Sequence, residues 1–152
     1  MNKSLTLSHP TGVINTSIKL PASKSEANRA LIISALSGAT TELQNLSEAN
    51  DTQLLQRLLK SNSEIIDAED AGTVMRFLTA YYAVTGQQKT LIGTERMCQR
   101  PIKVLVDALR ELGASITYLG EEGYPPLKIE AFKGSGKKHL SVRSDISSQY
   151  IS

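Results

Sequence analysis

The sequence contains no tryptophan, only two phenylalanines and a single cysteine. So few aromatic rings, together with a formal charge of only +2, argue against a surface that stacks and neutralises nucleic acid. Cys98 has no second cysteine with which to form an internal disulfide or share a metal ion, so we interpret it as a structural thiol. His9 and His139 lie in different segments, without the spacing of zinc ligands. The sequence therefore predicts neither a metal site nor a cofactor.

Long apolar runs are also missing. No segment approaches the roughly 20 apolar residues that a membrane-spanning helix needs. The polar start of the chain, residues 1–4, lacks the apolar core of a signal peptide. What is present is a hydrophobic content of 40% in 152 residues, enough for one core of ordinary size. These properties predict a globular, cytoplasmic protein.

The spacing of apolar residues alternates along the chain between strand and helix periods, which predicts an α/β (α+β) fold. We expect helices at 23–37, 50–60, 72–84 and 101–112, and strands at 40–46, 64–66, 89–92, 115–118, 127–131 and 140–142. Residues 5–20 alternate weakly around a turn at Thr11-Gly12, as in a β-hairpin. Asn50, Asp51 and Thr52 are expected to cap the second helix.

The first of these helices begins with a cluster of basic and hydroxyl residues. Pro21 ends the extended segment before it, and Ser23 or Ser25 can serve as the N-cap. Lys24 and Ser25 then lie at a helix N-terminus, where unpaired N–H groups and the helix dipole favour an anion, and Arg29 follows one turn later. This pattern predicts an anion-binding site, although the same residues could form an ordinary solvated cap.

A similar helix start recurs at a fixed spacing. Thr73 lies 48 residues after Ser25, at the opening of another apolar helix. Gly86, the expected end of that helix, lies 48 residues after Gly38, the expected end of the first. Self-similarity at this period predicts stacked supersecondary units. A third start of the same kind opens at 145–150, so we expect a ligand with several anionic groups.

Five short motifs follow one another along the chain: Leu20-Pro-Ala-Ser-Lys-Ser25 with Asn28-Arg29, Ala71-Gly-Thr73 with Met75-Arg76, Glu95-Arg-Met97 with Arg100-Pro-Ile102, Gly123-Tyr-Pro-Pro-Leu127, and Ser147-Ser-Gln149. Together they resemble the family of 5-enolpyruvylshikimate-3-phosphate synthase (3-phosphoshikimate 1-carboxyvinyltransferase). The resemblance implies two similar domains, each of three βαβαββ units, which close on their ligands. Residues 1–20 would then form a hairpin packed on the C-terminal domain. Residues 21–152 would form about two units of a partial N-terminal domain.

The resemblance also implies an activity. This family transfers the enolpyruvyl group of phosphoenolpyruvate to the 5-hydroxyl of shikimate 3-phosphate, on the route to chorismate and the aromatic amino acids. Its main acidic residues and further lysine and arginine ligands belong to the C-terminal half, which this sequence does not contain. We therefore expect the chain to be a fragment, inactive alone, of a protein that is monomeric when complete.

The site residues follow from the same motifs. The resemblance assigns these residues to shikimate 3-phosphate: Ser25, Arg29, Ser147, Ser148 and Gln149. It assigns these residues to phosphoenolpyruvate or its leaving phosphate: Lys24, Gly72, Arg100 and Gln149. Thr73 and Arg76 are expected beside them. Lys24 is the residue to which catalysis is assigned, as an electrostatic stabiliser and proton carrier.

The chain departs from the family pattern at three places. Asp70 stands where an asparagine usually precedes Ala-Gly-Thr, which places a carboxylate near the anion site. Phe77 stands where a proline commonly follows Met-Arg, and it bears on sensitivity to the herbicide glyphosate. The segment between Lys60 and Asp70 is shorter than the usual pair of strands.

Two alternatives stay open at the level of sequence. The related enzyme that acts on UDP-N-acetylglucosamine shares the fold, but its catalytic cysteine falls where this chain has Glu95, and Cys98 is displaced from that place. The other alternative is a non-catalytic module that binds phosphate-bearing ligands through the same helix starts.

Overall fold

The computed structural model of the chain describes residues 4–8, 10–13, 15–38, 42–137 and 139–142. Its elements follow in the order α1 (Lys24–Ser37), α2 (Asn50–Leu59), β1 (Ile65–Asp67), α3 (Gly72–Thr85), β2 (Lys89–Ile92), α4 (Glu95–Cys98), α5 (Lys103–Glu111), β3 (Ala114–Tyr118) and β4 (Leu127–Phe132). Within these described ranges, no helix combines the length and the apolar character that crossing a bilayer requires.

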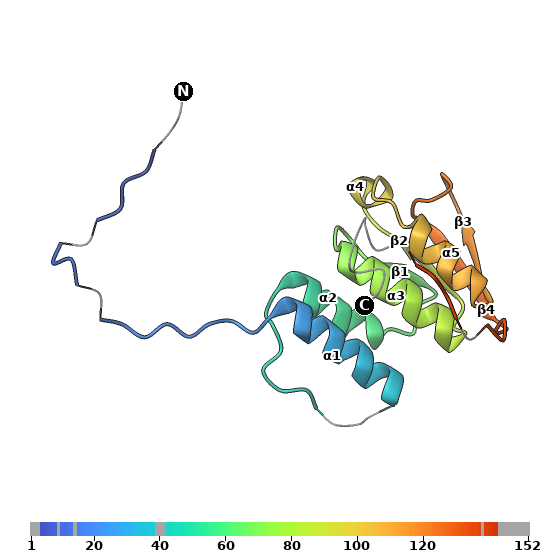
Figure 1. Cartoon of the computed structure of the whole chain (residues 1–152), viewed down its shortest axis with the longest axis horizontal. Coiled ribbons are helices and arrows are strands. Elements are labelled where there is room, and N and C mark those ends of the chain that lie inside the picture. The colour runs from blue at the N-terminus through green and yellow to red at the C-terminus, as the bar shows by residue number, and fades with distance from the viewer. Residues whose placement is uncertain (1–3, 9, 14, 39–41, 138, 143–152) are drawn as a thin grey trace.

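The four strands form one mixed sheet in the order β1-β2-β4-β3. β1 runs parallel to β2 with Ile66 opposite Leu91, and β4 runs antiparallel to both β2 and β3. Leu91 lies opposite Leu127, and Ile116 lies opposite Ile129. All five side chains are buried, as expected for strands that turn one face to a hydrophobic core. Helices α3 and α5 pack on the sheet (Figure 1).

Helix α3 lies at the centre of the core. Nine of its 14 residues are buried, and Val74 and Leu78 are fully shielded from solvent. It packs against β2, β3 and β4 on one side and against α1, α2 and α5 on the others. It ends at Gly86, whose φ of 67° is the left-handed conformation that favours glycine. The first turn of α3 is therefore carried by the most firmly packed element of the chain.

Most of the predicted elements form where the periodicity placed them. α1 begins after Ser23, whose hydroxyl accepts a hydrogen bond from the Glu26 N–H at 3.3 Å, which selects Ser23 over Ser25 as the N-cap. It ends at Gly38 with a φ of 63°, like α3 at Gly86. The mixed helix-and-sheet fold predicted from the sequence is confirmed.

The strand predicted over 40–46 does not form in the part that is described, residues 42–46; residues 39–41 lie outside the described ranges. Leu43 and Leu46 pack on the core from the loop between α1 and α2, and Asn45 has a φ of 53°, outside the strand region. The prediction was wrong because two leucines at this spacing can also pack on helices from an irregular loop.

The strand predicted over 140–142 is likewise absent from these residues. Val142 packs against the hydrophobic core without strand pairing. The third helix start, 145–150, lies outside the described residues.

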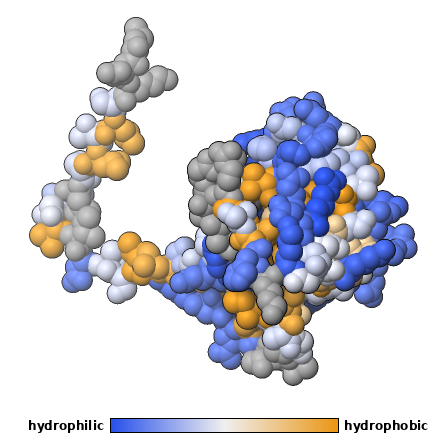
Figure 2. Space-filling view, turned by 45° about the vertical axis from the view of Figure 1, so that its right-hand side comes forward, coloured by the Kyte–Doolittle hydropathy of each residue, from blue (hydrophilic) through white to orange (hydrophobic). Residues whose placement is uncertain are grey.

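The N-terminal hairpin predicted over 5–20 does not form among the described residues of that segment. The chain turns near Gly12, whose φ is 64°, but no strands flank the turn. Leu7 and Ile18 are 86% and 78% exposed. The segment extends away from the rest of the molecule (Figure 1), and its hydrophobic residues are separate patches in Figure 2. A two-stranded hairpin alone is only marginally stable, so it needs a surface to pack against. Packing on a C-terminal domain stays a prediction.

The predicted cap of α2 was also wrong. The N-cap is Ala49, and no side chain caps the helix. The side chains of Asp51 and Thr52 turn instead toward α1, where Thr52 Oγ1 donates to Asn28 Oδ1 at 2.8 Å and Asp51 accepts from Lys24. Contacts between helices therefore outweigh the local capping that the sequence pattern suggested.

Candidate functional site

Helices α1 and α3 run side by side in the same direction (Figure 1). The guanidinium of Arg29 lies 5.9 Å from the centre of the Phe77 ring, and Phe77 follows Arg29 by 48 residues, the offset of the repeat. The groove of about 350 Å³ between the helices is lined by further pairs at this offset: Ile32 with Ala80, Ile33 with Tyr81, and Leu36 with Val84. Ser25 and Thr73, at the same offset, therefore occupy the same end of the two helices.

Helix α2 begins at that end too. Lys24, the first residue of α1, places its Nζ 3.0 Å from Oδ2 of Asp51, in the first turn of α2. The Lys24 side chain is 48% exposed, so this ion pair is screened by water. An exposed pair contributes at most about 1 kcal/mol, so an anionic ligand can replace the carboxylate at little cost. The sequence pattern missed Asp51, because it was interpreted only as a cap.

Gly72 and Arg100 are brought together by the fold. The guanidinium of Arg100 lies directly over the Cα of Gly72, so that a Cβ at position 72 would overlap it. Arg100 Nη1 donates to the carbonyl oxygen of Asp70 at 3.4 Å. The N-cap of α3 is Ala71, which has no capping side chain. The backbone N–H groups of the first turn and a guanidinium thus face the same space, an arrangement that suits a phosphate or carboxylate.

Arg76 stabilises the contact between Gly72 and Arg100 through hydrogen bonds to both segments. It is a buried residue one turn into α3, and its Nη1 donates to the Gly72 carbonyl at 3.2 Å while Nη2 donates to the Pro101 carbonyl at 3.1 Å. Since Pro101 directly follows Arg100, Arg76 ties the first turn of α3 to the segment that carries Arg100. These contacts place Arg76 beside Gly72 and the Arg100 segment, whereas its place beside a ligand stays a prediction. Thr73 is half-buried in the same turn.

Thr94 also lies in this region, and none of the motifs quoted from the sequence includes it. It is the N-cap of α4, and its hydroxyl oxygen accepts from the Met97 N–H at 3.3 Å. The same hydroxyl donates to Oδ1 of Asp70. A threonine three residues before a buried Met97 is a capping signal that could have revealed the short helix. The carboxylate of Asp70 is therefore held by a hydroxyl, and Arg100 contacts the backbone of the same residue. The place of Asp70 beside a bound anion stays a prediction.

The other predicted site residues are placed as follows. Ser25 is exposed in the first turn of α1, and its carbonyl accepts from Arg29 Nη1 at 3.1 Å. Lys24 and Ser25 lie at the start of α1, and Gly72 and Thr73 lie at the start of α3. The two helices pack against each other. Three predicted residues lie outside the described part of the chain: Ser147, Ser148 and Gln149.

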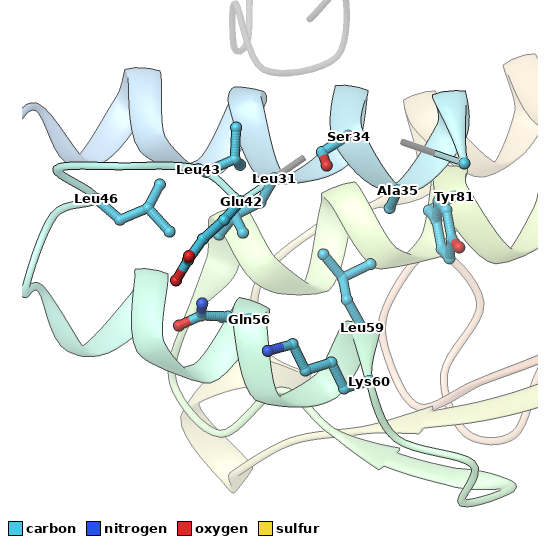
Figure 3. Close-up of a pocket in the computed structure, with 11 residues that line it drawn as sticks. Leu31, Ser34, Ala35, Glu42, Leu43, Leu46, Gln56, Leu59, Lys60 and Tyr81 are labelled. Carbon is cyan, nitrogen blue, oxygen red and sulfur yellow. The ribbon is translucent and has the colours of Figure 1, made fainter. Parts of the chain in front are cut away.

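A cavity of about 500 Å³ lies between α1, α2 and the loop found in place of the strand predicted over 40–46 (Figure 3). Leu43 and Leu46 line it from the loop, and Gln56 and Lys60 line it from α2 and its C-cap. Among the predicted site residues that the structure describes, none lines it. In the described part of the chain, no three histidine, cysteine, aspartate or glutamate side chains form a group that could hold a metal ion.

Comparison with known proteins identifies the family. The family model described as EPSP synthase (3-phosphoshikimate 1-carboxyvinyltransferase) matches residues 9–61 and 55–152. The chain is 53% identical over 139 residues to the 3-phosphoshikimate 1-carboxyvinyltransferase of Bacteroides fragilis strain YCH46, which covers 91% of this chain and 34% of that protein. The protein of the same name from Hamiltonella defensa is 38% identical over 178 residues, covering 99% of this chain and 41% of that protein.

A solved structure gives the same fold. EPSP synthase from Acinetobacter baumannii superimposes with a TM-score of 0.61 at 22% sequence identity, over 74% of this chain and 31% of that one. The chain thus spans between a third and two fifths of the length of the relatives it matches in sequence.

The alignments also bear on the shortened segment. The alignment with Hamiltonella defensa runs over 178 positions although this chain has 152 residues, so it contains gaps in this chain. The alignment with Bacteroides fragilis covers 91% of the chain in 139 positions, without such an excess. The two matches to the family model overlap at 55–61, next to the segment between Lys60 and Asp70.

The matches to the family model and to the named relatives favour the 5-enolpyruvylshikimate-3-phosphate synthase family over the two alternatives, the UDP-N-acetylglucosamine enzyme and the non-catalytic module. The chain belongs to the EPSP synthase (3-phosphoshikimate 1-carboxyvinyltransferase) family.

Proposed function

We propose that the protein of which this chain forms part transfers the enolpyruvyl group of phosphoenolpyruvate to the 5-hydroxyl of shikimate 3-phosphate. The products are 5-enolpyruvylshikimate 3-phosphate and phosphate, and the reaction serves the synthesis of chorismate and the aromatic amino acids. The observation that carries the proposal is the 53% identity to a relative with this name over 91% of the chain.

The reaction is an addition followed by an elimination. The 5-hydroxyl of shikimate 3-phosphate attacks C2 of phosphoenolpyruvate while C3 takes up a proton. The tetrahedral intermediate then loses phosphate from C2 and a proton from C3, which re-forms the double bond and gives the enol ether. Negative charge is carried throughout by two phosphates and two carboxylates, so donors that are in place beforehand stabilise the transition state with little rearrangement.

The start of α3 is suited to hold phosphoenolpyruvate or the leaving phosphate. Arg100 offers two parallel N–H groups for a bidentate contact, and the Gly72 N–H belongs to an uncapped helix start beneath it. Lys24 would join them by releasing Asp51, and its ammonium would neutralise charge and carry a proton. These assignments are supported by the motifs and by the contact between Gly72 and Arg100.

The start of α1 is suited to shikimate 3-phosphate. Ser25 is exposed there, and Arg29 lies one turn along, in the groove toward α3. Ser147, Ser148 and Gln149 would complete this part of the site, with the paired serines on the phosphate. A C-terminal domain of the same protein would supply the acidic residues for proton transfer, and the complete protein would act as a cytoplasmic monomer.

The substitution Lys24→Met in the complete protein tests the catalytic assignment. We expect a loss of phosphoenolpyruvate-dependent turnover of at least about a hundredfold, the usual scale for a residue in general acid-base catalysis, with thermal unfolding little changed. Lys128→Met is the matched control, since Lys128 also forms an exposed ion pair, with Glu130 at 3.2 Å. Turnover unchanged by Lys24→Met would remove Lys24 from the site.

A second test concerns the chain by itself. The 152-residue chain should bind shikimate 3-phosphate weakly and turn over nothing, because the acidic residues for proton transfer are expected in the C-terminal domain. Enolpyruvyl transfer by this chain alone would contradict the division of the site between two domains.

A further inference from the structure

We infer that Thr94 is a positioning residue for the anion site at the start of α3. Its hydroxyl holds the carboxylate of Asp70 toward α4, which leaves the guanidinium of Arg100 to the anionic substrate. The inference rests on the proposed function, and it concerns a residue that the family motifs do not include.

The hydrogen bond between Thr94 and Asp70 is one of a series that joins two segments of the chain. The turn at 68–71 leads from β1 into α3, and residues 92–94 lead from β2 into α4. The Ala68 N–H donates to the Ile92 carbonyl at 2.9 Å, and the Thr94 N–H donates to the Glu69 carbonyl at 3.3 Å. The hydrogen bond from Thr94 Oγ1 to Asp70 Oδ1 continues this series through side chains. Asp70 is thus fixed to the segment that leads on to Arg100.

The hydroxyl of Thr94 both donates and accepts a hydrogen bond. It has one proton to donate, and its oxygen already accepts the hydrogen bond from the Met97 N–H. The proton is therefore directed to Asp70, because rotating the hydroxyl elsewhere would give up the hydrogen bond to a charged acceptor. An ionised carboxylate only accepts hydrogen bonds, so Asp70 needs a donor of this kind.

Asp70 is also a hydrogen-bond partner of Arg100. Arg100 Nη1 donates to the backbone carbonyl of Asp70 at 3.4 Å while its guanidinium lies over Gly72. A carboxylate on the same residue, released from Thr94, would lie within reach of that guanidinium. It would then compete with the phosphate or carboxylate of the ligand for the same N–H groups. The hydrogen bond from Thr94 removes this competition.

A threonine that only caps α4 would behave differently. Loss of the hydroxyl would then lower the stability of the protein without affecting one substrate more than the other. The inference instead predicts a rise in KM for phosphoenolpyruvate, with kcat and the KM for shikimate 3-phosphate little changed. Steady-state kinetics of the complete protein with both substrates varied separates the two roles.

Two variants that both keep a capping side chain for α4 sharpen this test, because only one of them can donate a hydrogen bond to Asp70. In Thr94→Asp the side chain can still cap α4 but cannot donate to Asp70, and we expect the KM for phosphoenolpyruvate to rise by tenfold or more, about the effect of one lost hydrogen bond to a charged group. Thr94→Asn keeps both the cap and a donor and should stay within about threefold of the parent, since neither interaction is lost.

The decisive variant exchanges the hydrogen-bond donor and acceptor between positions 70 and 94. In the double variant Asp70→Asn with Thr94→Asp, the amide donates and the carboxylate accepts, so the hydrogen bond is restored in reverse and the net charge equals that of the parent. We expect its KM for phosphoenolpyruvate to return to within about threefold of the parent, because both features are regained. A double variant as impaired as Thr94→Asp alone would overturn the inference, and so would a parental KM in Thr94→Asp.

The outcomes also separate this inference from the proposed function. If the unsubstituted protein does not convert phosphoenolpyruvate and shikimate 3-phosphate, both fail. If it does so and Thr94→Asp has an unchanged KM, only the role of Thr94 fails. Should Thr94→Asp not fold, the double variant alone decides, since it must then be both folded and active with a near-parental KM.

Discussion

Helices α1 and α3 are equivalent elements of one repeat, yet they are packed very differently. Each has 14 residues and ends at a glycine in the left-handed conformation. Three residues of α1 are buried, against nine of α3. On α1, Ile33 and Leu36 are 66% and 51% exposed. The same pattern of sequence has therefore produced one central helix and one peripheral helix.

The sheet accounts for the difference. α3 packs against three of the four strands, whereas α1 packs chiefly against α2 and α3. The segment of the first unit that was expected to form a strand is a loop at residues 42–46, and β1 has only three residues. Local sequence thus sets the length and the ends of a helix. How deeply the helix is buried depends on the layer that covers it.

The largest effect should come from truncating the core face of α3. Leu78 is fully buried, and Leu78→Ala should lower the free energy of unfolding by about 2–5 kcal/mol, because it removes buried methyl groups and leaves a cavity. Leu36→Ala is the matched control on α1, where the exposed side chain should cost no more than about 0.5 kcal/mol. Urea unfolding measures both. Equal costs would show that the two helices are packed alike.

The next effect concerns the first positions of the two helices, which are Lys24 in α1 and Gly72 in α3. Gly72→Ala introduces a Cβ that overlaps the Arg100 guanidinium, so we expect the KM for phosphoenolpyruvate to rise by about tenfold to a hundredfold as the guanidinium is displaced. Gly38→Ala serves as a comparison, since nothing lies within 4 Å of a Cβ there; its left-handed φ should cost stability without raising that KM. A parental KM in Gly72→Ala would show that Arg100 moves aside freely.

A smaller effect is expected from the buried hydroxyl of α3. Tyr82 Oη donates to the Leu58 carbonyl at 3.2 Å, so Tyr82→Phe should lower the free energy of unfolding by about 1 kcal/mol at neutral pH. Ser34→Ala, at the equivalent position of α1, should change it by less than about 0.5 kcal/mol. Thermal or urea unfolding of the two variants gives the comparison, and a larger loss in Ser34→Ala would contradict it.

The same tyrosine makes stability depend on pH. Burial raises the pKa of Tyr82 from its ordinary value of 10.0 to about 12. Between these values the unfolded state loses the phenol proton while the folded state keeps it, so stability is lost as pH rises from 10 to about 12. Tyr82→Phe should flatten that part of the stability profile. An equally steep decline in Tyr82→Phe would exclude Tyr82 as its cause.

The smallest effect should follow from breaking the ion pair between α1 and α2. Asp51→Asn removes the partner of Lys24, and because both side chains are partly exposed we expect a change of at most about 1 kcal/mol, which 1 M salt should reduce further. Lys128→Met, which breaks a comparable surface pair, is the control. A loss well above this range would mean that the pair organises the helix starts.

Particular elements show where prediction from the sequence succeeded. The helix period and the glycines at 38 and 86 placed α1 and α3 correctly, because the period and the left-handed C-cap are local properties. The strand over 40–46 failed because alternating residues can also pack on helices from a loop. The capping of α2 by Asp51 failed because Lys24, 27 residues away, takes up its carboxylate.

The candidate site shows the same division. The motifs named Gly72 and Arg100 as parts of one anion site, and the structure brings them into contact. Thr94 was missed, since its hydrogen bond to Asp70 joins residues 24 positions apart, and no local pattern announces such a contact.

The sequence by itself determined the longer helices, the glycine ends of α1 and α3, the repeat and the family, because these depend on residues that are neighbours along the chain or on motifs kept in order. Only the tertiary structure decided which helix became the core, that Lys24 pairs with Asp51, and that Arg100 lies over Gly72. Those outcomes depend on surfaces that meet only when distant segments pack together. Burial and competition between partners then select one set of contacts among the many that the sequence allows.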